Sequence, residues 1–264
     1  MQTIKIIIFF CGVYFIFTSC GYAQTKLPGE WSLMVDAGGD IPASSSMRGT
    51  LYGFEQDFAN GYNNHQYPFG DGRSFAANFG GHLAYRFRSE KSPGEYTYSH
   101  WSAFIGVQGT FFSVSDPAVF SNSDNNSFSI LIATWTLGAE YTLGDPSDLF
   151  NAFGRVGLDA NLISGSILYN YYFSTAITDA FRFGYEAEIG GRYNIPATPL
   201  AIEASVDYTD ANLLGKNYVA PATLNNSNIL RERALNDGAN PNDPSDQSRT
   251  INDLSFRLGG RIWF

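Results

Sequence analysis

Apolar side chains recur at every second residue in eight segments of this chain, with mostly polar or small residues between them. Successive side chains of a β-strand point to opposite faces, so each segment predicts a strand with one apolar and one polar face. The alternation is clearest in residues 74–88 and in the last stretch, 254–264. The other predicted strands cover residues 30–41, 100–112, 128–143, 151–162, 181–194 and 200–208.

The connections between these strands alternate in length. Short ones, rich in the Gly, Pro, Asp and Ser of tight turns, cover residues 89–99, 144–149 and 194–199. Long ones cover residues 42–73, 113–127, 163–179 and 211–250. Transmembrane barrels place short turns in the periplasm and long loops outside the cell. Because lipid offers no hydrogen-bond partner, the sheet must close. We therefore predict an all-β fold, an eight-stranded antiparallel up-and-down transmembrane β-barrel with four extracellular loops.

The first residues predict a secretory signal peptide. Lys5 precedes an apolar run over residues 6–17, and the small residues Gly21 and Ala23 mark a cleavage site. We expect residues 1–23 to be removed and residues 24–264 to form the barrel. The alternative is a degenerate lipobox over residues 17–20 that leaves a lipidated Cys20. Both cysteines, Cys11 and Cys20, lie in this leader, so no disulfide is expected in the mature chain.

The amino-acid composition also limits the class of protein to which the chain can belong. The formal net charge of -9 argues against nucleic-acid binding, which needs a basic surface. Aromatic residues make up 16% of the chain, and it contains 27 glycines, a combination unusual for a soluble globular domain. Composition and strand pattern therefore favour the membrane barrel.

The polar faces of the predicted strands carry charges of both signs. Eight strands enclose an interior just wide enough for side chains, and buried charges are costly unless they are paired. We therefore expect a salt-bridge network that packs the lumen. The alternative is a narrow channel for small solutes whose charge pairs rearrange. The residues assigned to the network are Arg86, Glu140, Arg155, Asp159, Arg182, Glu186, Arg192, Glu203, Arg257 and Arg261.

The last strand ends in Phe264, with apolar or small residues at alternate preceding positions. With the architecture above, this ending resembles the small outer-membrane β-barrel family that includes the OmpA transmembrane domain and OmpX-like proteins. The resemblance implies a bacterial outer-membrane location, contact with membrane lipid and lipopolysaccharide, and recognition of Phe264 by the outer-membrane assembly machinery. It also implies a structural or surface-interaction role. We expect no peptidoglycan-binding domain after the last strand.

Catalytic, metal-binding and surface-binding residues were also sought in the sequence. His100 and Ser102 share a spacing that resembles that of lipid A deacylases, but they fall at the expected periplasmic end, away from that lipid, so we predict no enzyme. Residues 236–246 are rich in oxygen ligands, yet they match no calcium-loop spacing, so we expect a solvated loop with no metal and no cofactor. Tyrosine and phenylalanine in residues 42–73 and 163–179 favour either a surface ligand or partner, or packing against loops and lipopolysaccharide.

Overall fold

The computed structural model describes the strands of the chain and parts of their connections. The described residues are 31–42, 75–87, 99–114, 127–145, 148–169, 173–217, 233–234, 237–239, 241–242, 248 and 250–264. The predicted signal peptide, Cys20 and nearly all of the predicted loop at 42–73 lie outside these residues. Among the described residues, no helix has the length and apolar character to cross a bilayer.

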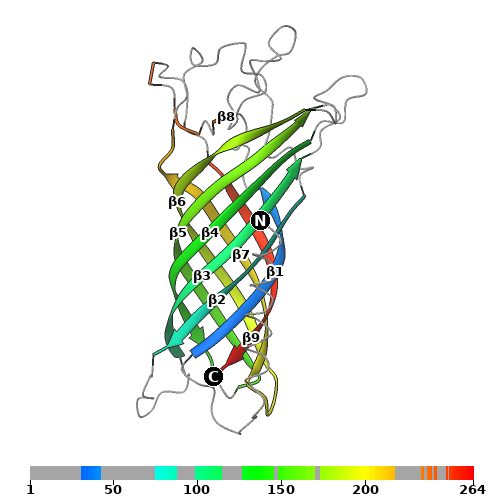
Figure 1. Cartoon of the computed structure of the whole chain (residues 1–264). Coiled ribbons are helices and arrows are strands. Elements are labelled where there is room, and N and C mark those ends of the chain that lie inside the picture. The colour runs from blue at the N-terminus through cyan, green and yellow to red at the C-terminus, as the bar shows by residue number, and fades with distance from the viewer. Residues whose placement is uncertain are drawn as a thin grey trace.

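Eight long strands form one antiparallel barrel (Figure 1). Each long strand pairs with the next long strand along the chain, so that β7 pairs with β9, and β9 returns to pair with β1. A ninth, two-residue strand, β8, pairs in parallel with β6. The bounds are β1 Trp31–Pro42, β2 Phe75–Arg86, β3 Ser99–Val114, β4 Ser127–Leu143, β5 Phe150–Tyr169, β6 Phe173–Asn194, β7 Leu200–Leu214, β8 Arg233–Ala234 and β9 Asn252–Trp263.

The register fixes how the barrel closes. Partners followed around the sheet from Ser32 lead through every long strand and return to β1 at Pro42, a stagger of ten residues. Such a stagger tilts the strands against the barrel axis, as Figure 1 shows. It also brings side chains that are far apart in the sequence to the same height inside the bore. The contacts across the lumen therefore depend on closure.

The two ends of the barrel differ. At one end, which we call the terminal end, Phe264 donates its backbone N–H to the carbonyl of Trp31 over 3.0 Å. The short connections after β4 and β6 lie at this end, where Gly144 with φ 114° and Ala197 with φ 61° make tight turns. The opposite end, which we call the distal end, carries the connections after β1, β3, β5 and β7. The predicted fold is confirmed, but the alternation of connection lengths holds only in part, because residues 170–172 alone separate β5 from β6 at the distal end.

The structure corrects the bounds of the third predicted loop. Residues 163–179 were expected to connect two strands, but β5 continues to Tyr169 and β6 begins at Phe173. Tyr169 and Phe173 are paired strand residues, and Tyr171 and Tyr172 lie outside the described residues. The hairpin continues because backbone pairing does not require an apolar face once the strands have passed the apolar band. The fourth predicted loop also begins later, since β7 runs to Leu214.

Two adjacent glycines give a matched test of how tightly the bore is filled. A Cβ on Gly190 would lie 2.5 Å from the Phe153 ring and 2.6 Å from the carbonyl oxygen of Ala204, whereas a Cβ on Gly191 would meet no atom within 4 Å. We expect Gly190→Ala to lower the free energy of unfolding by about 1–3 kcal/mol through overpacking. Gly191→Ala should be close to neutral in the same urea titration in lipid vesicles. A Gly190→Ala chain as stable as the Gly191→Ala chain would show that the bore has room for another methyl group.

Candidate functional site

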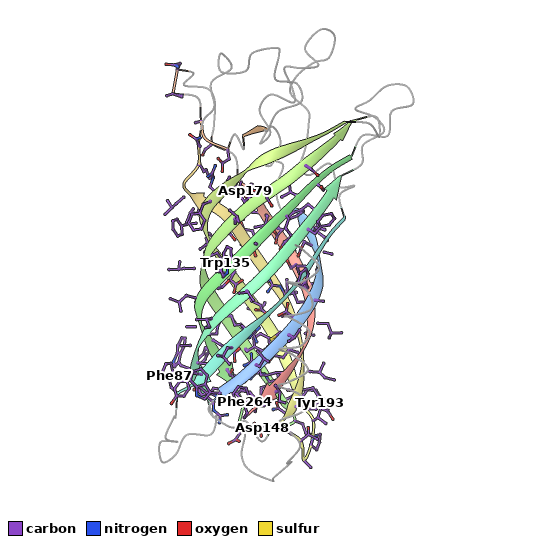
Figure 2. The ribbon with its side chains drawn as sticks, in the orientation of Figure 1. Phe87, Trp135, Asp148, Asp179, Tyr193 and Phe264 are labelled. Atoms are coloured by element: carbon purple, nitrogen blue, oxygen red, sulfur yellow. The ribbon has the colours of Figure 1, made fainter. Side chains whose placement is uncertain are left out.

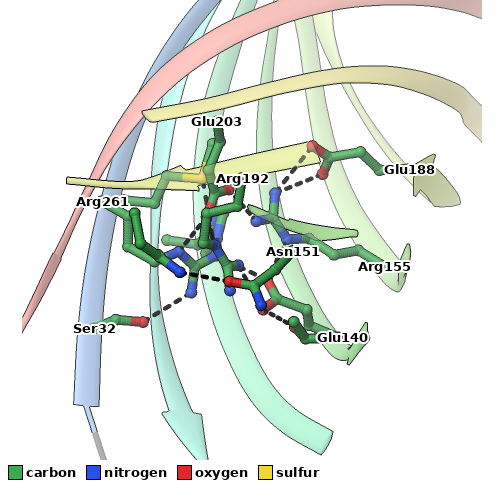
Figure 3. A network of polar contacts seen from close by, with 12 residues as sticks. Ser32, Glu140, Asn151, Arg155, Glu188, Arg192, Glu203 and Arg261 are labelled. Carbon is green, nitrogen blue, oxygen red and sulfur yellow. Dashed lines mark hydrogen bonds and ion pairs between the residues drawn. The ribbon is translucent and has the colours of Figure 1, made fainter. Parts of the chain in front are cut away.

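Three arginines and three glutamates interlock inside the barrel near the terminal end (Figure 3). Arg155 on β5 donates from Nε to Glu140 over 2.6 Å, from Nη1 to both oxygens of Glu188 over 2.9 Å, and from Nη2 to Glu203. Arg155 thus contacts three carboxylates that come from β4, β6 and β7. We call the set Glu140, Arg155, Glu188, Arg192, Glu203 and Arg261 the ionic lock.

The other two arginines complete the lock from the neighbouring strands. Arg192 on β6 donates to Glu140 over 2.8 Å and to Glu203. Arg261 on β9 also donates to Glu140 over 2.8 Å and to Glu203, and it reaches Ser32 on β1 over 2.8 Å. Glu140 and Glu203 therefore each accept from all three arginines. The lock joins five strands directly and, through Ser32, a sixth.

The lock is both buried and balanced in charge. The side chains of its ion pairs are at most 2% exposed. Breaking one partner of such a buried pair leaves an uncompensated charge, which costs about 3–5 kcal/mol. The lock contains three positive and three negative side chains, so its charges balance without an outside ion.

Aromatic rings lie beside the guanidinium groups. The Arg155 guanidinium is 4.1 Å from the centre of the Phe153 ring, and the groups of Arg192 and Arg261 are 5.4 and 5.3 Å from the Trp263 ring. Arg86 also lies over Trp263, at 5.2 Å. A cation over the face of an aromatic ring is attracted by its quadrupole. Trp263, only 6% exposed, thus lines the bore at the terminal end.

A second group of charged side chains lies further along the bore and is mostly acidic. Arg257 donates to Asp207 over 2.6 Å, and Thr136 donates to Asp159 over 2.8 Å. Arg257, Asp36 and Glu186 also line a small cavity of about 20 Å³, enough for about one water molecule. The buried carboxyl groups in this acidic layer are Asp36, Asp40, Asp159, Glu186, Asp207 and Asp253.

The residues that the sequence analysis assigned to one network lie in separate groups in the structure. Glu140, Arg155, Arg192, Glu203 and Arg261 meet in the ionic lock. Arg257, Asp159 and Glu186 belong to the acidic layer, and Arg86 lies over Trp263. Arg182 lies apart from both groups and pairs with Asp237, over 2.7 and 2.8 Å.

Two residues carry contacts that the assigned set left out. Glu188 takes both hydrogen bonds of Arg155 Nη1, although its alternation on β6 already placed it inward. Asp237 falls in the stretch 236–246 that was expected to be a solvated loop, but it is fully buried. That expectation is wrong for Asp237, because Arg182, Asn212 and the backbone of Asn217 surround its carboxylate with donors.

The residues considered for catalysis lie within the barrel. His100 and Ser102 on β3 are 3% and 1% exposed, and Ser102 stands opposite Glu140 in the sheet. A catalytic pair must reach its substrate, and these side chains face the bore rather than the outer surface. Across the described ranges, no three His, Cys, Asp or Glu side chains are grouped so that they could hold a metal ion.

The outer surface of the barrel is apolar, whereas the lumen is polar. Leu158 and Ile189 are 73% and 71% exposed, and side chains such as Trp135 project outward (Figure 2). The outward positions of β4 stay apolar or aromatic over Leu131, Ala133, Trp135, Leu137, Ala139, Tyr141 and Leu143, long enough for a membrane strand.

Aromatic pairs mark both margins of this band. Trp31 packs on Tyr85 and Trp101 on Tyr141 at the terminal end, with ring centres 4.9 and 4.8 Å apart. Phe181 and Phe183 pack at 5.1 Å towards the distal end. Figure 2 shows Phe87, Tyr193 and Phe264 gathered at the terminal end. A closed barrel with a polar interior, an apolar band and aromatic margins is a transmembrane β-barrel of the outer-membrane type.

Comparisons with known proteins find similarity to solved structures only. No protein-family model matches the chain, and no curated protein matches its sequence. Among solved structures, the chain is similar to neisserial surface protein A, with 11% identity, a TM-score of 0.38, and coverage of 90% of this chain and 100% of that one. It is also similar to Ail, the attachment invasion locus protein of Yersinia pestis, with 13% identity, a TM-score of 0.35, and coverage of 90% and 99%.

Proposed function

We propose that this protein is a non-enzymatic component of the bacterial outer membrane whose bore is closed by the ionic lock. The observation that carries the proposal is the set of ion pairs that joins Glu140 and Glu203 to Arg155, Arg192 and Arg261 across the lumen. Opening a path would require buried charges to separate, which is costly in a bore surrounded by lipid. The barrel then acts as a rigid anchor in the envelope.

The short turns after β4 and β6 support an orientation, although the connection between β5 and β6 at the distal end is also short. The terminal end, with its short turns, faces the periplasm, and the distal end faces the outside of the cell. Residues 42–73 would lie outside the cell, where their tyrosines and phenylalanines are candidates for contact with a surface ligand, a partner protein or lipopolysaccharide. Phe264, at the terminal end, would provide the signal for the outer-membrane assembly machinery.

The acidic layer favours a second candidate, a narrow conduit for small solutes. Oxygen atoms of Asp36, Asp159 and Asp207 are buried without a hydrogen-bond partner among the described side chains. Buried polar atoms of this kind usually form hydrogen bonds with ordered water. A hydrated acidic layer would provide part of a path, and the ionic lock would then act as its gate.

Conductance separates the two candidates. We expect the full chain in planar lipid bilayers to show no stable openings. Steady openings in the unmodified protein would refute the closed bore and favour the conduit, and liposome swelling with small sugars would then test passage of uncharged solutes. Asp179→Asn, an exposed change near the distal end, provides a control for the preparation.

A further inference from the structure

A recess of about 510 Å³ lies on the outer surface of the barrel and crosses its strands from β3 to β9. Paired residues of adjacent strands lie side by side, so their outward-facing side chains form rows that cross the strands. Two neighbouring rows line this hollow, which we call the outer recess. The central members of one row are Tyr141, Gly154 and Ile189, and those of the next are Ala139, Val156 and Ala187.

Small residues form the floor of the outer recess. Gly154 on β5 has Ala139 on β4 and Ala187 on β6 as its diagonal neighbours in the other row. These three positions therefore stay low between larger side chains. A Cβ on Gly154 would meet only the carbonyl oxygen of Glu188, at 3.8 Å, so the space above the floor is open.

The lining of the recess is apolar even where charged residues contribute to it. Arg155 and Glu188 line the recess, but their side chains are at most 2% exposed and pair with each other in the ionic lock. Beside the floor, Val156 and Ile189 are 59% and 71% exposed. A volume of about 510 Å³ lies within the range of small-molecule sites, about 300–1,000 Å³. The lining therefore suits a hydrocarbon ligand of small-molecule size.

The recess begins at the aromatic margin of the apolar band. Trp101 lies near the terminal end of β3 and packs on Tyr141, with ring centres 4.8 Å apart. Val206, further along the recess, lies deeper in the barrel on β7. The strands are tilted, so rows that cross them climb from the terminal end towards the distal end (Figure 1). A chain that follows the recess thus runs from headgroup level, where Trp and Tyr side chains gather, into the hydrocarbon.

We propose that the outer recess binds one acyl chain of a phospholipid from the membrane leaflet at the terminal end. The chain lies over Ala139, Gly154 and Ala187, and the headgroup lies beside Trp101 and Tyr141. The recess is continuous with the lipid-facing surface, so the surrounding bilayer supplies hydrocarbon as its occupant. Packing on three sides holds this lipid more tightly than the lipid around the rest of the barrel. The proposal does not depend on whether the bore conducts.

Filling the floor of the recess tests the proposal. The full chain in detergent is titrated with a phosphatidylethanolamine that carries palmitoyl and oleoyl chains, and native mass spectrometry counts the lipids that each chain retains. We expect one retained lipid, and Gly154→Leu should lower its affinity by about tenfold because the new side chain occupies the place of the acyl chain. Gly191→Leu is the matched control, since Gly191 is an exposed strand glycine outside the recess whose Cβ would meet no atom within 4 Å. It should leave the affinity unchanged.

A second floor variant keeps the test decisive. Ala187→Leu fills the same recess from β6 and should also lower the affinity, whereas Ala204→Leu, at an exposed position of β7 outside the recess, should not. Folding of every variant is checked by its heat-dependent gel migration. An unmodified chain that retains no phospholipid would overturn the proposal, and so would folded floor variants that bind it as tightly as the controls. Conductance plays no part in these results, so the proposed function is tested separately.

Discussion

Glu203→Gln should lower the free energy of unfolding by about 3–5 kcal/mol, because it removes a carboxylate shared by three buried guanidinium groups. Glu203 accepts from Arg155, Arg192 and Arg261, and its side chain is fully buried in these pairs. The amide is nearly the same size, so the loss reports charge rather than a cavity. A urea titration in lipid vesicles, read from the gel migration of folded and unfolded chains, measures it.

The control and a double variant make this result specific to the lock. Asp179→Asn makes a comparable change at an exposed site and should be nearly neutral. Arg192→Gln combined with Glu203→Gln should cost less than the sum of the two single changes, because the pair is lost only once. A Glu203→Gln chain as stable as the control would show that the lock does not hold the barrel together.

Leu158→Arg should cost about 2–4 kcal/mol in a bilayer, because it places a charge on the lipid face within the apolar band. Leu158 is 73% exposed, so the change disturbs no packing within the protein, and only the surroundings of the barrel can penalise it. The measurement is the same urea titration in vesicles. A surface that faced water would tolerate the arginine.

Ser166→Arg is the matched control on the same strand. Ser166 is exposed on the part of β5 beyond the apolar band, where it pairs with Ser129 across the sheet. The same substitution there should change stability by about 0.5 kcal/mol or less, as for most surface positions. Equal losses for the two variants would contradict a membrane boundary between them.

Most strands of the barrel could be predicted because the alternation of apolar and polar residues is visible within each short segment of the sequence. In β2 and β4 the alternation directly predicts one apolar and one polar face. This is because one face of each strand contacts lipid and the other contacts the narrow bore, so the side-chain type changes at every second position. The same reasoning failed at residues 163–179, which were expected to form a long loop. Beyond the bilayer nothing selects for alternation, so β5 and β6 continue without that signal.

The partners inside the bore were less predictable because they depend on closure. Arg155 and Glu140 are opposite each other on neighbouring strands, but Arg261 reaches Glu140 only after the barrel closes with its stagger of ten residues. Asp237 was missed for a similar reason. Its donors come from Arg182, Asn212 and Asn217, and no short motif brings these three together.

The central claim is a closed barrel with lipid outside and charged side chains within. Single spin labels placed in turn at residues 131–138 of β4, in lipid vesicles, test it most directly through their contact with dissolved oxygen and with a water-soluble relaxant. We expect high oxygen contact at Leu131, Ala133, Trp135 and Leu137, and low contact with either reagent at the positions between. Strong contact with the water-soluble relaxant along the whole segment, or loss of the two-residue period, would contradict the account.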